Sequence, residues 1–247
     1  MILGTAMIRR MFLVLKLART GSTMLGQAMD GHPQIHCALE LMNPVLSEDK
    51  QTKLDYFRDY YANGPGDDSG AQHGATLNPF KYQLGPDDVG DVLRDIEDSG
   101  QAGSWKLIVL IRRNKLKQAT SAYLSEQRGS WESSGKNVPR QGRQTFDLWQ
   151  LQSMTLAYWR NTIRLRRFAK QLGHPTMTVY YEDLAERPAD EYQKIFRFLG
   201  VDTVGPDFDY TAGLTKVGNK ELRDTIDNYS SMKFYPLLWP YLVGPLK

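Results

Sequence analysis

The chain has 247 residues, of which 41% are hydrophobic and 11% aromatic, and this suffices for one sizeable buried core. A formal net charge of +3 permits an anionic ligand but falls well short of the basicity of a dedicated nucleic-acid-binding protein. The single cysteine, Cys37, excludes an intramolecular disulfide and a multi-cysteine zinc site. It also agrees with a reducing compartment, so the predicted location is the cytoplasm.

The N-terminal segment joins a basic pair, Arg9 and Arg10, to the apolar run 11–17, as signal peptides do. Lys16 interrupts that run, Arg19 follows it, and no small-residue cleavage site is present, so we interpret it as a buried first strand. No stretch reaches the roughly 18 apolar residues of a membrane-spanning helix. No integral membrane segment is therefore predicted.

The next elements alternate in type. Apolar residues at helical spacing predict a helix over 22–29, which the Gly and Pro of "DGHPQIHC" end. A second helix is predicted over 48–62, and residues 63–79 have loop composition throughout. The segment 80–84, "FKYQL", is strand-like, and proline with acids begins a helix at "PDDVGDVLRDIEDSG".

The second half of the chain continues the alternation. The run 105–113 is strongly apolar and is expected to lie centrally in the sheet. Apolar residues at intervals of three, four or seven mark a long amphipathic helix over 148–172. The other predicted elements are a helix over 114–127, a loop over 129–143, a strand over 176–181, a helix over 189–200 and a helix within 219–229.

Strands that alternate with helices usually form a parallel sheet covered by helices on both faces. The predicted fold class is α/β, with three layers around a central, mainly parallel sheet as in P-loop proteins, and residues 1–247 form a single domain. No internal repeat indicates a solenoid. The loops 63–79 and 129–143 are expected to shape a substrate pocket.

The stretch "LARTGSTMLG" carries the chain from the first strand into the first helix. Its backbone N–H groups lie at the positive end of a helix dipole, Arg19 adds a charge, and Gly21 permits close approach, which suits a phosphate. Ser22 stands where a nucleotide-binding P-loop has its lysine, so the machinery for a triphosphate is missing. The alternative is that Arg-Thr-Gly-Ser-Thr is only a turn and helix cap, since Ser and Thr are favoured caps.

A second stretch, "LIRRNKLKQATSAYLSEQRGSW", again leaves an apolar strand for a helix. Arg113 lies at the carboxyl end of the strand, and Ser121 follows eight residues later, about two turns into the helix. Ligands of α/β sheets bind at the carboxyl ends of strands. Two anion sites at one sheet edge indicate a ligand with two phosphates.

These two stretches, in this order, resemble the signature segments of sulfotransferases that use 3′-phosphoadenosine 5′-phosphosulfate (PAPS). The later "VYYEDLAERPADEYQKIFRFLGV" also resembles a segment of that family, and the resemblance extends from about Phe12 to Val201. The most similar branch is the bacterial one that acts on carbohydrates, such as nodulation-factor and trehalose sulfotransferases. The resemblance implies transfer of a sulfuryl group from PAPS to an acceptor hydroxyl, with 3′-phosphoadenosine 5′-phosphate (PAP) as product and no metal.

The resemblance also implies residue roles. The 3′-phosphate would be held by Arg113 and Ser121, and Lys216 in "TKVGNK" is a candidate for an additional basic contact. The family often has Lys in place of Arg19, and because arginine stays protonated its part in proton transfer to the leaving oxygen is in doubt. The residues that would hold the 5′-phosphosulfate are Arg19, Thr20, Gly21, Ser22 and Thr23.

Two residues after the first helix are candidates for the general base. The resemblance favours Glu40, because carbohydrate-sulfating relatives place a catalytic Glu shortly after the phosphosulfate helix. His36 ranks second, since its ordinary pKa of about 6.5 suits a base. The alternatives are a solvated or helix-capping carboxylate for Glu40 and a hydrogen-bonded core histidine for His36.

Further candidates are less specific. Lys81 is a candidate to point at the transferring group, and Trp131 and His73 are candidates to line the acceptor pocket. Glu182 and Asp183 are expected to cap the helix that follows them. The histidines show no metal-ligand spacing, so no metal is predicted.

Two other functions stay open at this point. A nucleotide kinase or NTPase on a similar sheet is disfavoured by the missing P-loop lysine, and a non-catalytic nucleotide-binding protein would keep the site without the base. The expected partner is a carbohydrate or small-molecule acceptor and not a nucleic acid. The acceptor is undetermined by the sequence, and an oligomer is compatible with it.

Overall fold

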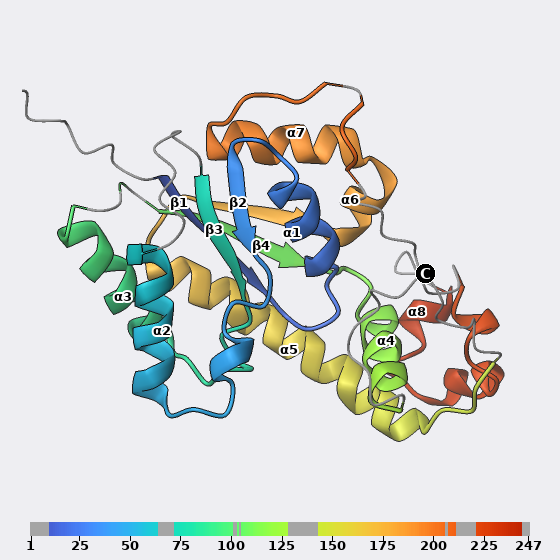
Figure 1. Cartoon of the computed structure of the whole chain (residues 1–247). Coiled ribbons are helices and arrows are strands. Elements are labelled where there is room, and N and C mark those ends of the chain that lie inside the picture. The colour runs from blue at the N-terminus through green and yellow to red at the C-terminus, as the bar shows by residue number, and fades with distance from the viewer. Residues whose placement is uncertain are drawn as a thin grey trace, which may run out of the picture.

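Five parallel strands form the sheet in the computed structural model, which describes residues 10–63, 72–100, 103, 105–127, 143–205, 207–210 and 221–243 (Figure 1). The strand order is β2-β3-β1-β4-β5, and every pair is parallel. The predicted α/β class is thereby confirmed. The strands are β1 Arg10–Lys16, β2 Ile35–Ala38, β3 Gln72–Leu77, β4 Lys106–Ile111 and β5 Thr176–Tyr180.

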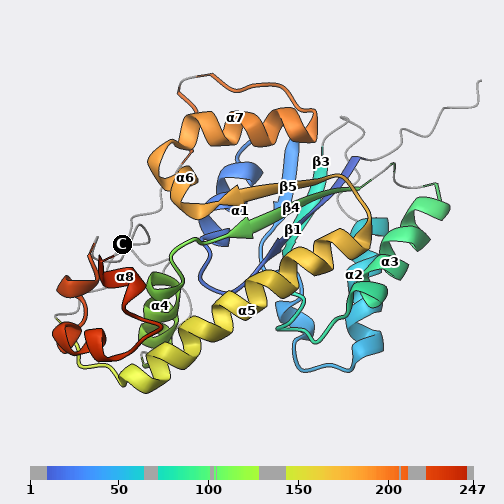
Figure 2. The same cartoon turned by 180° about the vertical axis from the view of Figure 1, so that it is seen from behind.

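The helices cover both faces of this sheet. In both views α1, α6 and α7 lie on one face and α2, α3 and α5 on the other, while α4 lies beyond the sheet's edge (Figures 1 and 2). The α-helices are α1 Ser22–Asp30, α2 Lys50–Asn63, α3 Pro86–Asp98, α4 Lys115–Gln127, α5 Leu148–Leu172, α6 Tyr181–Glu186, α7 Pro188–Leu199 and α8 Pro240–Val243. Short 3₁₀ helices span Asn43–Val45, Leu222–Asp224 and Tyr229–Phe234.

The apolar run predicted as the first strand is β1, which is buried on both faces. Phe12 and Val14 belong to the core beneath α1 and α7, whereas Leu13 and Leu15 belong to the core beneath α2, α3 and α5. Successive side chains of a strand point to opposite faces, so a strand buried on both faces of a parallel sheet is usually a continuous apolar run. This tendency makes β1 recognisable in the sequence.

The longest helix has the predicted bounds, Leu148–Leu172. The Asp147 carboxylate accepts hydrogen bonds from the backbone N–H groups of Trp149 and Gln150, at 2.9 and 3.0 Å. Gly173, with φ of 76°, ends the helix. Nowhere in the described ranges does a helix combine the length and apolar character needed to span a bilayer.

One strand was wrongly predicted as loop. Residues 72–77, within the predicted loop 63–79, form β3, which is buried along its whole length between β2 and β1. Its sequence "QHGATL" is poor in apolar residues, and Gly74 is required because a Cβ there would overlap the Phe12 ring. Gln72 Nε2 donates to the Leu199 carbonyl, 2.7 Å away, so this buried polar side chain is bonded to a helix far along the chain.

Three further predictions differ from the structure. The segment 80–84 turns instead of extending, with Gln83 at φ 59° and the Leu84 N–H donating to the Pro79 carbonyl at 2.9 Å. Strand β2 follows α1 where only a helix end was predicted. In the helix predicted within 219–229, the described part contains the 3₁₀ helix Leu222–Asp224 and a turn.

Candidate active site

Apart from His36, the predicted site residues that the structure describes gather at the carboxyl edge of the sheet, where β1 and β4 are neighbours. From β1 the chain crosses to β2 on one side, and from β4 it continues to β5 on the other, so the two connections diverge here (Figure 1). Such a switch point is where open α/β sheets bind ligands. The turns that follow β1 and β4 therefore flank one position.

The turn after β1 has an unusual backbone. Arg19 and Gly21 both have positive φ angles, 60° and 86°. A side chain at Gly21 would also overlap the Tyr181 ring, so only glycine fits this position. Gly21 is the N-cap of α1, and no side chain caps the helix there. No Ser or Thr side chain of this stretch therefore caps the helix, and Ser22 and Thr23 lie within the first turn of α1.

The hydroxyl groups of this turn differ in their surroundings. Thr20 is buried, and its Oγ1 donates to the Leu17 carbonyl at 2.8 Å, so it stabilises the turn from inside. Ser22 is 8% exposed, whereas Thr23 lies at the surface. Together with the uncapped N-terminus of α1, these groups offer donors to an anion.

Side chains from α4 and the turn before it hold the β1 turn in place. Gln118 Nε2 donates to the Ala18 carbonyl at 2.7 Å, and Arg112 Nη1 donates to the Arg19 carbonyl at 3.3 Å. Arg19 Nε in turn donates to Ser121 Oγ at 2.9 Å. The structure therefore brings together Arg19 and Ser121, which stand 102 positions apart.

Arg113 lies at the same edge of the sheet but contacts other side chains. Its guanidinium forms a bidentate ion pair with Asp183, at 2.5 and 2.7 Å, and stacks over the Tyr180 ring at 3.9 Å. This pairing lowers the pKa of the Asp183 carboxyl. Ser121 is hydrogen-bonded to Arg19, so Arg113 and Ser121 have different partners.

Glu182 and Asp183 were predicted to cap their own helix, and this prediction is wrong. The Glu182 carboxylate accepts hydrogen bonds from the backbone N–H groups of Arg113 and Asn114, at 2.9 and 3.0 Å, just before α4. Tyr180 is the N-cap of α6, without a side-chain cap. Both carboxylates thus bond the segment that follows β4, because the carboxyl ends of β4 and β5 are adjacent.

Arg112, the first arginine of the pair after β4, was missed by the sequence interpretation. It lies over the Tyr181 ring at 4.8 Å, and burial lowers its pKa. Its Nε is buried without a hydrogen-bond partner among the described residues. The signal in the sequence was the doubled arginine, but which of the two faces the turn depends on the tertiary structure.

Glu40 is brought to the end of β1 from the far side of β3. It follows β2 with φ of 48°, and its N–H donates to Thr76 Oγ1 at 2.9 Å. Its carboxylate forms an ion pair with Lys16 and lies 3.8 Å from Lys81 Nζ. Lys16 was not predicted as a site residue, although a lysine at the end of an apolar strand was a signal.

Polar side chains continue the site beyond Glu40. Asn43 Oδ1 accepts hydrogen bonds from Lys81 Nζ at 2.7 Å and from the Tyr82 hydroxyl at 2.8 Å. Burial, followed by the nearby Glu40 carboxylate, raises the pKa of Tyr82. Lys81 was a candidate from the sequence, and it does lie beside Glu40.

His36 lies within β2, apart from this cluster. Its ring stacks on that of His73 at 5.3 Å, and Nδ1 is 3.3 Å from Asp30 Oδ1. His73 was predicted in a loop, but it is buried in β3, where Tyr60 stacks on its other side at 4.7 Å. Neither histidine reaches the turn that follows β1. Lys216 and Trp131, which were also predicted, lie outside the described residues.

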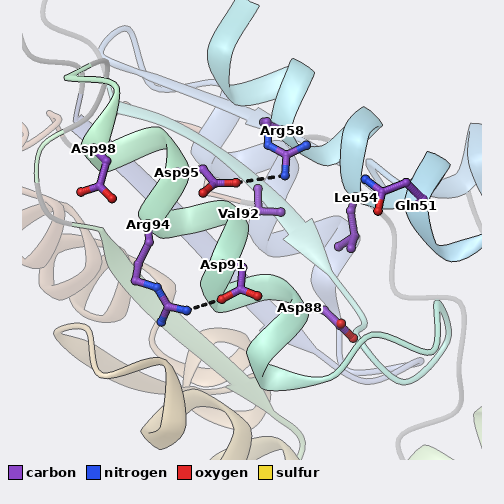
Figure 3. A pocket seen from close by; sticks show the side chains of 9 residues that line it. All are labelled: Gln51, Leu54, Arg58, Asp88, Asp91, Val92, Arg94, Asp95 and Asp98. Carbon is purple, nitrogen blue, oxygen red and sulfur yellow. Dashed lines mark hydrogen bonds and ion pairs between the residues drawn. The ribbon is translucent and has the colours of Figure 1, made fainter.

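A pocket of about 420 Å³ lies elsewhere, between α2 and α3 (Figure 3). Its charged walls largely pair with each other, as Arg58 does with Asp95 at 3.0 Å and Arg94 with Asp91. None of the predicted site residues that the structure describes lines it. Across those same parts of the chain, no cluster of three His, Cys, Asp or Glu side chains suits a metal ion.

Known proteins resemble this chain in sequence and in fold. The profile of a family described as "Sulfotransferase domain" matches residues 9–233. The solved structure of mouse sulfotransferase SULT7A1 complexed with PAP is similar, with a TM-score of 0.51 and 13% identity, over 84% of this chain and 66% of that chain. A sulfotransferase from Alicyclobacillus acidocaldarius matches with a TM-score of 0.49 and 16% identity, over 94% of each chain. No curated protein sequence matches.

Proposed function

Because this chain belongs to the sulfotransferase domain family, we propose that it transfers a sulfuryl group from PAPS to a hydroxyl of a carbohydrate or another small-molecule alcohol. The observation that supports PAPS as the sulfuryl donor is the hydrogen bond between Arg19 and Ser121, at 2.9 Å. It joins the turn after β1 to α4, so the two anion-binding segments form one site at the sheet edge. A ligand with phosphates at both its 3′ and 5′ positions fits such a site.

The residues present suit this donor. The N-terminus of α1 has no side-chain cap, and Arg112 Nε is a buried donor without a partner among the described residues. Arg19 supplies a permanent positive charge beside these groups. When bound, PAPS supplies the sulfuryl group, and every other requirement falls to the protein's own side chains.

In this proposal the β1 turn binds the 5′-phosphosulfate, through Arg19, Gly21, Ser22 and Thr23, while Thr20 stabilises the turn beneath it. Ser121 and Arg113 hold the 3′-phosphate from the α4 side. Arg113 has five N–H donors, two of which bond Asp183, so the others remain for a phosphate. Lys216 keeps its proposed role as an additional basic contact.

Glu40 is the proposed general base. Its carboxylate lies at the carboxyl edge, between Lys16 and Lys81, and its side chain is 33% exposed and therefore open to an acceptor. It would take the proton of the acceptor hydroxyl as the acceptor oxygen attacks sulfur, and Arg19 would neutralise the charge on the leaving oxygen. His36 is the weaker candidate, since it is stacked on His73 within β2.

The acceptor remains a proposal from the polar surroundings of Glu40. Asn43, Lys81 and Tyr82 present hydrogen-bonding groups there, which suits a polyol better than an apolar phenol.

The proposed location is the cytoplasm, because the buried free thiol of Cys37 fits a reducing compartment.

Calorimetric titration with PAP in the absence of Mg²⁺ tests the donor. Wild type is expected to bind, while Ser121→Ala and Arg113→Ala bind roughly 5- to 150-fold more weakly, the equivalent of about 1–3 kcal/mol. Arg197→Ala, an exposed change on α7, is the matched control. Binding of ATP that requires Mg²⁺, with no binding of PAP, would instead indicate a kinase or NTPase.

Turnover by Glu40→Gln tests the base. With PAPS as donor and trehalose and p-nitrophenol as probe acceptors, kcat is expected to fall by about 10² or more if Glu40 takes the proton. PAP affinity should stay near that of wild type, because Glu40 lies on the acceptor side. An unchanged kcat would remove Glu40 from the mechanism and leave the donor assignment intact.

A further inference from the structure

Lys16 is the last residue of β1, and its side chain is 4% exposed. A lysine is almost never this buried unless it is paired. Burial lowers the pKa of Lys16, and the nearby Glu40 carboxylate opposes that effect. The fold therefore places an ammonium group in its interior, at the edge where the proposed reaction takes place.

The partner of this ammonium is Glu40, through its Oε1. Glu40 follows β2, and this strand is not a neighbour of β1, which carries Lys16, because β3 lies between them. The Glu40 carboxylate reaches across the end of β3, where Thr76 of that strand accepts a hydrogen bond from the Glu40 N–H. Two independent contacts thus fix the backbone and the carboxylate of the proposed base.

Other charges face the same carboxylate. Lys81 Nζ is 3.8 Å from Glu40 Oε2, and Arg19 is close enough to act electrostatically on Lys16. The Lys81 side chain is 37% exposed, so water and salt screen its charge more than that of Lys16. The Tyr82 hydroxyl is the remaining titratable neighbour.

We propose that Lys16 is a positioning residue, which binds Oε1 of Glu40 and thereby fixes the carboxylate with Oε2 facing the acceptor side. This inference rests on the proposed role of Glu40 as the base. Oε2 is the oxygen turned toward the partly exposed Lys81, and it is therefore the one that an acceptor hydroxyl can approach. Lys16 itself need touch neither substrate.

Steady-state kinetics with PAPS and the same probe acceptors, beside titration with PAP, test the proposal. In Lys16→Met kcat is expected to fall by about tenfold or more, because the carboxylate of the base is no longer held in place, while PAP affinity stays near that of wild type. Lys81→Met should lower kcat less, and Lys16→Arg, which keeps a cation at this position, should restore most of it.

A kcat of Lys16→Met equal to that of wild type would overturn the proposal, and so would a larger loss in Lys81→Met. If Lys16→Met does not fold, a kcat of Lys16→Arg as low as that of Glu40→Gln contradicts the rescue that we expect. Failure of the proposed function is a separate observation, namely absence of PAP binding by wild type or an unchanged kcat in Glu40→Gln.

Discussion

Arg19 and Gly21 are strained or specialised residues at the point where the donor is proposed to bind. A left-handed conformation costs a non-glycine residue roughly 1–2 kcal/mol, so Arg19 needs contacts that offset this cost. It has them in the bonds from Arg112 to its carbonyl and from its own Nε to Ser121. Strain that is held in place by surrounding contacts is characteristic of binding and catalytic sites.

Gly21→Ala is the corresponding prediction. The new methyl group meets both the positive φ of 86° and the Tyr181 ring, so the turn must shift. We expect PAP affinity to fall at least about tenfold and the free energy of unfolding to fall by roughly 1–2 kcal/mol. Calorimetry and urea unfolding measure the two effects. Gly205→Ala, where a Cβ meets open space, is the control, and equal PAP affinity in the two variants would contradict the prediction.

At the scale of elements, the start of α4 determines where Ser121 lies. Asn114 Oδ1 accepts a hydrogen bond from the Lys117 N–H at 2.8 Å, and Glu182 of α6 accepts the two N–H groups before the helix. Lys115 is buried in the first turn, where its Nζ donates to the Arg112 carbonyl. The helix is therefore held from β5–α6 on one side and from the β1 turn on the other.

Lys115→Met is predicted to stabilise the protein near pH 7. Burial lowers the pKa of Lys115 from 10.5 to about 8, so the charge of Lys115 lowers the stability of the wild type by roughly 3 kcal/mol at pH 7. The variant also loses the hydrogen bond to the Arg112 carbonyl, which offsets about 1 kcal/mol of its gain. Between those two pKa values the unfolded chain binds more protons, so the stability of the wild type rises with pH in that window. The advantage of the variant should therefore shrink from pH 7 to pH 10.

Urea unfolding of wild type and variant at pH 7, 8.5 and 10 measures this effect. Lys233→Met, at an exposed lysine, should show no such pH dependence. A stability difference between wild type and Lys115→Met that stays constant with pH would mean that Lys115 titrates as an ordinary lysine.

At the scale of the whole molecule, the C-terminal segment is part of the support of the site. It packs against α4 and the start of α5 in a cluster separate from the two cores of the sheet, seen beside α4 in Figures 1 and 2. A parallel bridge between Gln144 and Ile226 adds backbone pairing to this contact. The cluster includes Leu116, Ala119, Leu148, Leu151, Leu222, Ile226, Met232 and Leu238.

Met232→Ala should lower the free energy of unfolding by roughly 2–5 kcal/mol, because it removes a fully buried side chain and leaves a cavity. Phe234→Ala is the control, since the Phe234 side chain is 75% exposed only two residues away. Equilibrium urea unfolding of both variants decides the matter. Equal stabilities would show that the C-terminal segment contributes little to the packing around α4.

Much of the fold was predictable because its signals are local. β1 is an apolar run, α5 has an amphipathic period with Asp147 and Gly173 at its ends, and α7 ends at Gly200. The residue types of the two turns that are proposed to bind the donor were also apparent, since glycine, hydroxyl and arginine side chains follow two apolar strands. Each of these features depends on residues within a few positions of each other.

What the tertiary structure alone decided is which distant residues meet. β3 is accommodated in the sheet because Gly74 fits against Phe12 and Gln72 Nε2 donates to a carbonyl of α7. Lys16 pairs with Glu40 across the end of β3, and Arg19 bonds Ser121, which is 102 positions away in the sequence. Side-chain partners of this kind follow from strand order and packing, which local propensity does not encode, so the sequence by itself determined the parts of the site and the fold determined their pairing.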